Sequence, residues 1–174
     1  SPVADNVNNT EFDALRTIVW TTSLIGYAFY ARSNVGINGS IYYIKTTDGG
    51  ATWGSSTKVN STTEATKATD QWSVYYDQWT PGSSGTKIHL IWLEVIGTDP
   101  APIIYRALDT SDDSLGTEVT ALTIACSSGL CGSGSNFHPP SIVIARGGNL
   151  YVLSSSTGHF FRSVDGGATW TSRS

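Results

Sequence analysis

The stretch "TTDGGATW", residues 46–53, returns near the other end of the chain as "SVDGGATW", residues 163–170. Each copy follows a short run of apolar and aromatic residues, as a turn follows a β-strand. The two glycines supply the positive φ values of a tight turn, and the aspartate before them can accept hydrogen bonds from backbone N–H groups of that turn. We therefore expect a structural role in the turn for Thr46, Asp48, Gly50, Thr52 and Trp53 in the first copy, and for Ser163, Asp165, Gly167, Thr169 and Trp170 in the second.

Short runs of β-branched and aromatic residues recur along the whole chain, separated by turn residues such as "TPGSSG" and "ARGGN". This composition is typical of strands, and helix signals are almost absent. We expect strands within "RTIVW", "GYAFYA", "SIYYIK", "WSVYYDQW", "KIHLIWLEV", "PIIYRAL", "TEVTALTI", "SIVIA", "NLYVLSS" and "HFFRS". The sequence thus predicts an all-β fold.

A third, weaker copy of the repeat lies between the two full ones. The segments "IYYIKTTDGG", "PIIYRALDTS" and "GHFFRSVDGG" align without gaps, which places Asp48, Asp109 and Asp165 in one column at spacings of 61 and 56 residues. The same alignment places Lys45, Arg106 and Arg162 in another column. A period of this length holds about four short strands, as in one blade of a β-propeller.

The two full phrases resemble the Asp boxes, or BNR repeats, of sialidase-type β-propellers, and "ALDTSDDSLG" resembles a degenerate copy. The resemblance implies blades of four antiparallel strands, with each box on the turn between the third and fourth strands, on the side away from the active site. We expect an N-terminal extension over 1–14 and blades over 15–60, 61–125 and 126–174, the last with an incomplete outer strand.

Three blades do not close a ring. The expected arc therefore needs further blades of the same polypeptide, other copies of the chain, or another protein surface against its open sides.

Composition limits the partners of the protein. Only 14% of the residues are charged and the net charge is -4, so the basic surface of a nucleic-acid-binding protein is missing. No apolar run is long enough to span a bilayer. The polar residues are mainly Ser, Thr, Asn and Gly, which favours an extracellular, secreted or particle-surface protein.

The two cysteines, Cys126 and Cys131, lie in a Gly/Ser-rich stretch without further zinc ligands. We expect a local disulfide between them, which agrees with an oxidising compartment, and two free thiols are the alternative.

A sialidase would need three arginines around the substrate carboxylate, since guanidinium groups pair with carboxylates through two hydrogen bonds. Arg16, at the start of the first expected inner strand, is a weak candidate for such a role, although the aromatic and proline neighbours of the family phrase are missing. Arg106 and Arg162 belong to the repeat column, where an outward-facing strand residue is the simpler interpretation. We therefore expect no catalytic activity from this segment, and the enzyme assignment stays open.

The ligand-binding face of a propeller is built from the loops at the end opposite the boxes, and long loops tend to carry function. Trp72 there could stack on a sugar ring or belong to the core, and His138 is interpreted mainly as a loop residue. The candidates on this face are Arg32, Asp70, Trp72, Glu94, Asp99 and His138.

The stretch "DTSDDSLG" has oxygen-bearing side chains at Asp109, Ser111 and Asp113, which resembles the start of a calcium loop. It lacks the glycine at the sixth position and a correctly spaced acid, so a solvated turn is the alternative and no cofactor is expected.

The sequence favours a propeller module for binding or display that contacts a glycan or a protein surface. The alternatives are part of a sialidase or other exo-glycosidase, and a structural subunit of a virion or filament.

Overall fold

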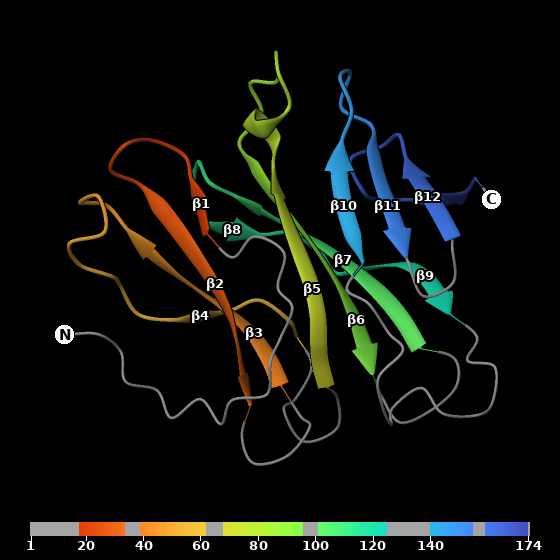
Figure 1. Cartoon of the computed structure of the whole chain (residues 1–174), viewed down its shortest axis with the longest axis horizontal. Helices are drawn as coiled ribbons and strands as arrows, with labels where there is room; N and C mark the ends of the chain where they lie inside the picture. The colour runs from red at the N-terminus through yellow and green to blue at the C-terminus, as the bar shows by residue number, and fades with distance from the viewer. Residues whose placement is uncertain are drawn as a thin grey trace.

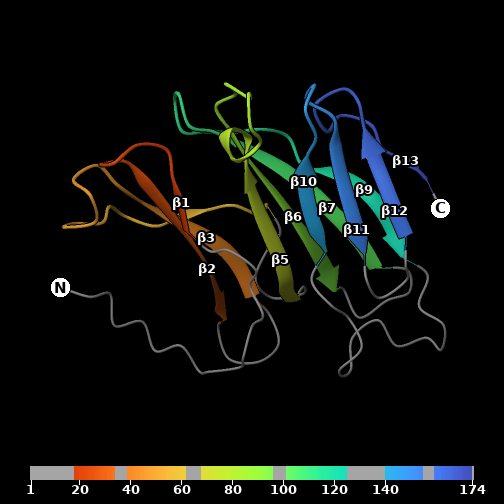
Figure 2. The same cartoon turned by 45° about the horizontal axis from the view of Figure 1, so that its top comes forward.

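The computed structural model describes residues 18–33, 39–61, 68–95, 101–124, 140–154 and 159–173. These residues form thirteen strands and one 3-10 turn at Asp77–Trp79, arranged as three antiparallel sheets. The prediction of an all-β chain is confirmed. Both views show the sheets side by side in chain order, with the middle sheet between the other two (Figures 1 and 2).

The first sheet has the strand order β1-β2-β3-β4. Its strands are β1 (Ile18–Trp20), β2 (Gly26–Ser33), β3 (Gly39–Thr46) and β4 (Thr57–Lys58). The outer strand begins only at Thr57, because Gly54 first closes the turn by donating its N–H to the carbonyl of Lys45 at 2.8 Å.

The middle sheet has the order β5-β6-β7-β8, and β9 also pairs with β7. Its strands are β5 (Ala68–Tyr76), β6 (Lys87–Val95), β7 (Ala101–Asp109), β8 (Ser114–Leu115) and β9 (Val119–Ile124). The outer strand is therefore split into two pieces that pair with successive parts of β7.

The last sheet repeats the order of the first, β10-β11-β12-β13. Its strands are β10 (Ser141–Ile144), β11 (Leu150–Ser154), β12 (His159–Ser163) and β13 (Thr171–Ser172). The first and last sheets are thus meanders in which neighbours in the chain are neighbours in the sheet, and the middle sheet departs from this only at β9, which pairs with β7.

The middle sheet is buried on both faces. Along β6, Leu90 and Trp92 pack in the core shared with the first sheet, and Ile91 and Leu93 pack in the core shared with the last sheet. This explains why "KIHLIWLEV" is apolar at successive positions, since side chains of a strand point alternately to its two faces. We call these two cores the first seam and the second seam.

The strand pairing corrects the gapless alignment of the middle unit. The second and third strands of each sheet are paired residue by residue. The equivalent pairs near the end of the third strand, on the same face of each sheet, are Gly26–Thr46, Ile88–Leu108 and Leu150–Ser163. Asp48 and Asp165 follow this position by two residues, whereas Asp109 follows it by one. Asp109 is therefore not in the box column.

A shift of one residue moves a strand side chain to the opposite face. Lys45 accordingly faces the middle sheet, where it pairs with Asp113, whereas Arg106 faces back and donates a hydrogen bond to the carbonyl of Val59 in the first repeat unit. The predicted column of Lys45, Arg106 and Arg162 is wrong for Arg106. In the middle unit Asp113 adopts the positive φ, 62°, that glycines supply in the full boxes.

Among the described residues, no helix is both long and apolar enough to cross a membrane.

Candidate functional site

The first box turn is closed by hydrogen bonds among its own residues. The Asp48 carboxylate accepts from the backbone N–H and the hydroxyl of Thr52, at 2.9 and 2.6 Å, and from the hydroxyl of Thr46 at 2.7 Å. The Thr46 hydroxyl in turn accepts from the N–H of Gly50 at 3.0 Å. Gly49 and Gly50 have φ values of 74° and 91°, which only glycine adopts readily.

The last-sheet box turn repeats this arrangement. Asp165 accepts from the N–H of Thr169 at 2.9 Å and from the Ser163 hydroxyl at 2.7 Å, and Gly167 donates to the Ser163 oxygen at 2.8 Å. Trp170 donates its indole N–H to the carbonyl of Gly167 at 3.0 Å. Both aspartates are used inside their turns, so the arrangement is suited to holding a turn rather than to catalysis.

These hydrogen bonds lower the pKa values of both box aspartates. The Thr52 hydroxyl and N–H hold the pKa of Asp48 at about 2, below its ordinary value of 3.8. Thr169 has the same effect on Asp165, whose pKa is also about 2. Both carboxylates therefore stabilise the fold in their ionised form.

The box turns give the protein an acid-sensitive stability. Because the folded-state pKa is the lower one, the contribution is complete above the unfolded pKa, near 4, and is lost as the pH falls towards 2. We expect the double variant Asp48→Asn, Asp165→Asn to be less stable at neutral pH and to lose less stability on acidification. Urea unfolding at a series of pH values measures this, and an unchanged pH profile would contradict it.

The last box turn also joins the last sheet to the middle sheet. The hydroxyl of Tyr105, on β7, donates to the carbonyl of Gly166 at 3.1 Å, and its ring lies edge-on to that of Trp170 with 5.4 Å between centroids. A Cβ at Gly167 would overlap the Tyr105 ring. The glycine is therefore required both for its φ and for the close approach of the ring.

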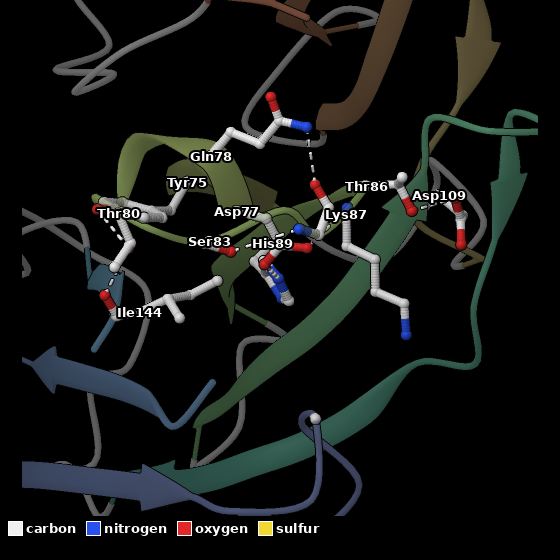
Figure 3. A network of polar contacts seen from close by, with 12 residues as sticks. Tyr75, Asp77, Gln78, Thr80, Ser83, Thr86, Lys87, His89, Asp109 and Ile144 are labelled. Carbon is white, nitrogen blue, oxygen red and sulfur yellow. Dashed lines mark hydrogen bonds and ion pairs between the residues drawn. The ribbon is translucent and has the colours of Figure 1, made fainter. Parts of the chain in front are cut away.

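Tyr105 is also held by His89, which in turn contacts Asp77. The sequence alone did not indicate a role for either residue. Nε2 of His89 lies 3.0 Å from Oδ1 of Asp77, and Nδ1 lies 2.7 Å from the Tyr105 hydroxyl. Figure 3 shows the Asp77 and His89 side chains facing each other below the 3-10 turn. The missing signal was spatial, since the three residues come from different segments of the middle sheet.

Burial determines what this Asp–His–Tyr arrangement can do. Burial raises the pKa of Tyr105. Burial alone would also raise the pKa of Asp77, but hydrogen bonds from His89 and from the N–H of Lys87 lower it overall. His89 and Tyr105 are both core residues, without a surface on which a substrate could meet them. The arrangement therefore fixes Tyr105 beneath the box turn.

Further polar contacts join the middle and last sheets at the same end. The Thr80 hydroxyl donates to the carbonyl of Ile144 at 2.7 Å and lies 3.1 Å from the Tyr75 hydroxyl (Figure 3). This part of the second seam, like the box turns, uses its hydrogen-bonding groups within the protein.

The turn in the middle sheet joins that sheet to the first one. Asp113 accepts from the Tyr27 hydroxyl at 2.6 Å and from Nζ of Lys45 at 2.7 Å, both on the first sheet. Asp109 instead accepts from Ser111 and from the Thr86 hydroxyl. The carboxylates of Asp109 and Asp113 thus have separate partners, and within the described residues no three His, Cys, Asp or Glu side chains gather as metal ligands.

The opposite ends of the strands form what we call the loop end. There β2 leads to β3, β4 to β5, β6 to β7, β9 to β10 and β11 to β12 (Figure 1). Arg32 on β2, Asp70 on β5 and Glu94 on β6 lie in the strand portions near this end. For Arg32 and Asp70 the backbone alone is described.

Two of the predicted ligand residues are buried. Trp72 is 2% exposed and packs beside Phe29 in the first seam, so a role in stacking on an exposed sugar ring is wrong for this conformation. Glu94 is 4% exposed on the same strand as Trp92. Among the described residues, the indole N–H groups of Trp72 and Trp92 have no hydrogen-bond partner.

The remaining candidates lie outside the described residues. They are Arg16, Asp99 and His138, together with Cys126 and Cys131, and their predicted roles stay predictions.

No protein-family model matches the sequence, and no curated protein is similar to it. Among solved structures, the chain is similar to a protein of unknown function from Dyadobacter fermentans, with 14% identity and a TM-score of 0.47. The match covers 84% of this chain and 45% of that one, so this chain spans less than half of the other protein.

Proposed function

We propose that the three sheets are consecutive blades of an Asp-box β-propeller module, and that the module binds a glycan at its loop end. The observation that carries the proposal is a difference between the two ends of the sheets: the polar groups at the box end bind to one another within the protein. The box turns use their hydrogen-bonding groups within themselves, and the last box turn also accepts a hydrogen bond from Tyr105, which His89 and Asp77 hold in place. The loop end is therefore the better place for a ligand site.

The first seam supports this choice near the loop end. It contains two buried indole N–H groups, those of Trp72 and Trp92, to which no described residue offers an acceptor, and β6 continues from Trp92 to the buried carboxylate of Glu94. Buried donors without acceptors are rare in proteins and often mark functional positions.

The composition and the box repeats support a secreted or particle-surface protein. The enzyme alternative gains nothing from Arg106, because its guanidinium already donates to the carbonyls of Gly116 and Val59 and pairs with Glu118. A structural subunit is the second candidate, since apolar side chains are exposed on the outer faces of the first and last sheets.

Glycan binding can be tested on a glycan array that includes sialyllactose and lactose, followed by titration of the glycans that bind. We expect Arg32→Ala and Asp70→Ala to weaken binding at least about tenfold, as loss of a central contact does. The matched controls at the box end are Arg146→Ala and Asp112→Ala, both exposed, and these should leave binding unchanged. Binding that persists in the loop-end variants, or no glycan bound by the wild type, would contradict the proposal.

A hydrolysis assay on the same protein distinguishes glycan binding from the enzyme alternative. We expect no hydrolysis of a fluorogenic sialoside by this chain. Saturable hydrolysis that is lost in Arg16→Ala would place the sialidase function first.

A further inference from the structure

Each sheet carries an aromatic pair at the same two positions, on the face directed towards the next sheet in the chain. We call these the forward pairs, and the strand pairing makes them equivalent: Tyr27 and Tyr43, His89 and Tyr105, and Tyr151 and Phe160. The ring centroids within the pairs are 5.9, 5.8 and 5.4 Å apart. A cation lies over the first pair and the third, Lys45 near Tyr27 and Arg162 near Tyr151.

Two of the three forward pairs are covered by the turn of the following sheet. Tyr27 and Lys45 are bonded to Asp113 in the turn of the middle sheet. Tyr105 lies against Gly166, Gly167 and Trp170 in the box turn of the last sheet. The chain thus uses one type of contact twice, a box-end turn on a forward pair.

None of the sheets formed by the described residues packs on the third forward pair. Phe160 is 38% exposed, and Nε of Arg162 is a buried donor with no hydrogen-bond partner in the described part of the chain, whereas the equivalent Lys45 is paired. Val143, Leu153 and Val164 extend the exposed apolar surface of this face. The Tyr151–Phe160 face therefore offers an uncovered forward pair, which is one of the two surfaces that meet in each seam.

The other half lies on the outer face of the first sheet. Its box turn has the same "DGGATW" sequence and the same internal hydrogen bonds as the turn that packs on Tyr105. Trp20 covers Gly50 and lies 6.3 Å from the ring of Trp53, and it is itself 42% exposed. Together with Ile18 and Leu24, it makes this face apolar.

The exposed large apolar residues of the described chain all belong to the first and last sheets, and none belongs to the middle sheet. The middle sheet is the one that has a neighbour on both faces. Exposure thus follows the absence of a neighbouring sheet, and extended apolar surfaces of this kind mark protein contacts.

We infer that the protein associates head to tail with copies of itself, the first-sheet face of one copy packing on the Tyr151–Phe160 face of the next. The contact resembles the two internal seams, except that the Trp20 ring, which covers Gly50, packs on the exposed forward pair together with the first box turn. Such an interface joins two different surfaces, so it produces a closed ring or an open filament rather than a simple two-fold dimer.

Two charge substitutions, Phe160→Glu and Trp20→Glu, test this inference. In sedimentation over a range of concentrations, we expect the wild type to form assemblies larger than a dimer. Each variant should lose this association, by about 30-fold or more in Kd, because each has one damaged face. Thr123→Glu, an exposed position on the middle sheet, is the matched control and should assemble like the wild type.

An equimolar mixture of the two variants gives the sharpest result. The intact last sheet of the Trp20→Glu chain and the intact first sheet of the Phe160→Glu chain should form one interface and stop at a heterodimer. Circular dichroism and thermal melting verify that both variants are folded. A wild type that stays monomeric at every concentration, variants that assemble like the wild type, or a mixture that forms no heterodimer would overturn the inference.

Discussion

Gly167→Ala is expected to lower the free energy of unfolding by about 2–5 kcal/mol, through a strained φ and an overpacked contact. Gly167 has a φ of 96°, where an L-residue is strained, and its added Cβ would overlap ring atoms of Tyr105. The Tyr105 ring has little room to move, since it is held by His89 and by Trp170. Urea unfolding monitored by tryptophan fluorescence measures the loss.

The neighbouring glycine is a matched control. Gly166 has a φ of 72°, and a Cβ there would meet no atom within 4 Å. Gly166→Ala should therefore cost only the backbone strain, about 1–2 kcal/mol. Equal losses for the two variants would mean that the contact with Tyr105 contributes nothing.

Trp92→Ala is expected to lower the free energy of unfolding by about 3–5 kcal/mol, the range found for truncating a buried aromatic side chain. Trp92 is fully buried in the first seam, near Trp72 on the paired strand β5. The cavity left by the indole would lie between the first and middle sheets. Chemical denaturation measures this loss, and a loss below about 1 kcal/mol would contradict the packing of the first seam.

Trp92→Phe separates the packing of the ring from its N–H group. Phenylalanine keeps much of the buried apolar surface and removes a donor that has no acceptor among residues of the described ranges. We expect Trp92→Phe to lower the free energy of unfolding by less than half as much as Trp92→Ala, since an unpaired buried N–H contributes no stability. A cost as large as that of Trp92→Ala would show that the N–H is bonded in solution.

Strand positions were predictable because this chain alternates β-formers with strong turn signals. The segments "SIYYIK" and "KIHLIWLEV" became β3 and β6 almost as expected. The two full box turns were also predictable, since their glycines and hydroxyl residues are local to the turn and form its hydrogen bonds without help from other segments.

The strand register of the middle unit was not predictable from the sequence repeat. The alignment matched Asp109 to the box aspartates, but the turn there contains no glycine and is built around Asp113 instead. Pairing with β6 fixes the register, and that pairing is a contact between segments distant in sequence. The same limit hid the link from Asp77 and His89 to Tyr105.

The candidate binding residues were harder to judge. Sequence position placed Arg32, Asp70 and Glu94 near one end of the sheets, where their strands indeed lie. It could not show that Trp72 is buried, because an aromatic residue near a strand end is compatible with both the core and an exposed face. The packing of Phe29 from the first sheet decides this.

The central claim is that the last copy of the repeated phrase joins the last sheet to the middle sheet, and a double-mutant cycle between Gly167→Ala and Tyr105→Val tests it most directly. Valine is a favourable strand residue for β7 and removes the ring that approaches Gly167. In the Tyr105→Val background, we predict that Gly167→Ala costs no more than Gly166→Ala does in the wild type, because no ring remains to clash. If Gly167→Ala costs the same with and without the Tyr105 ring, the box turn does not pack on the preceding sheet and the account is wrong.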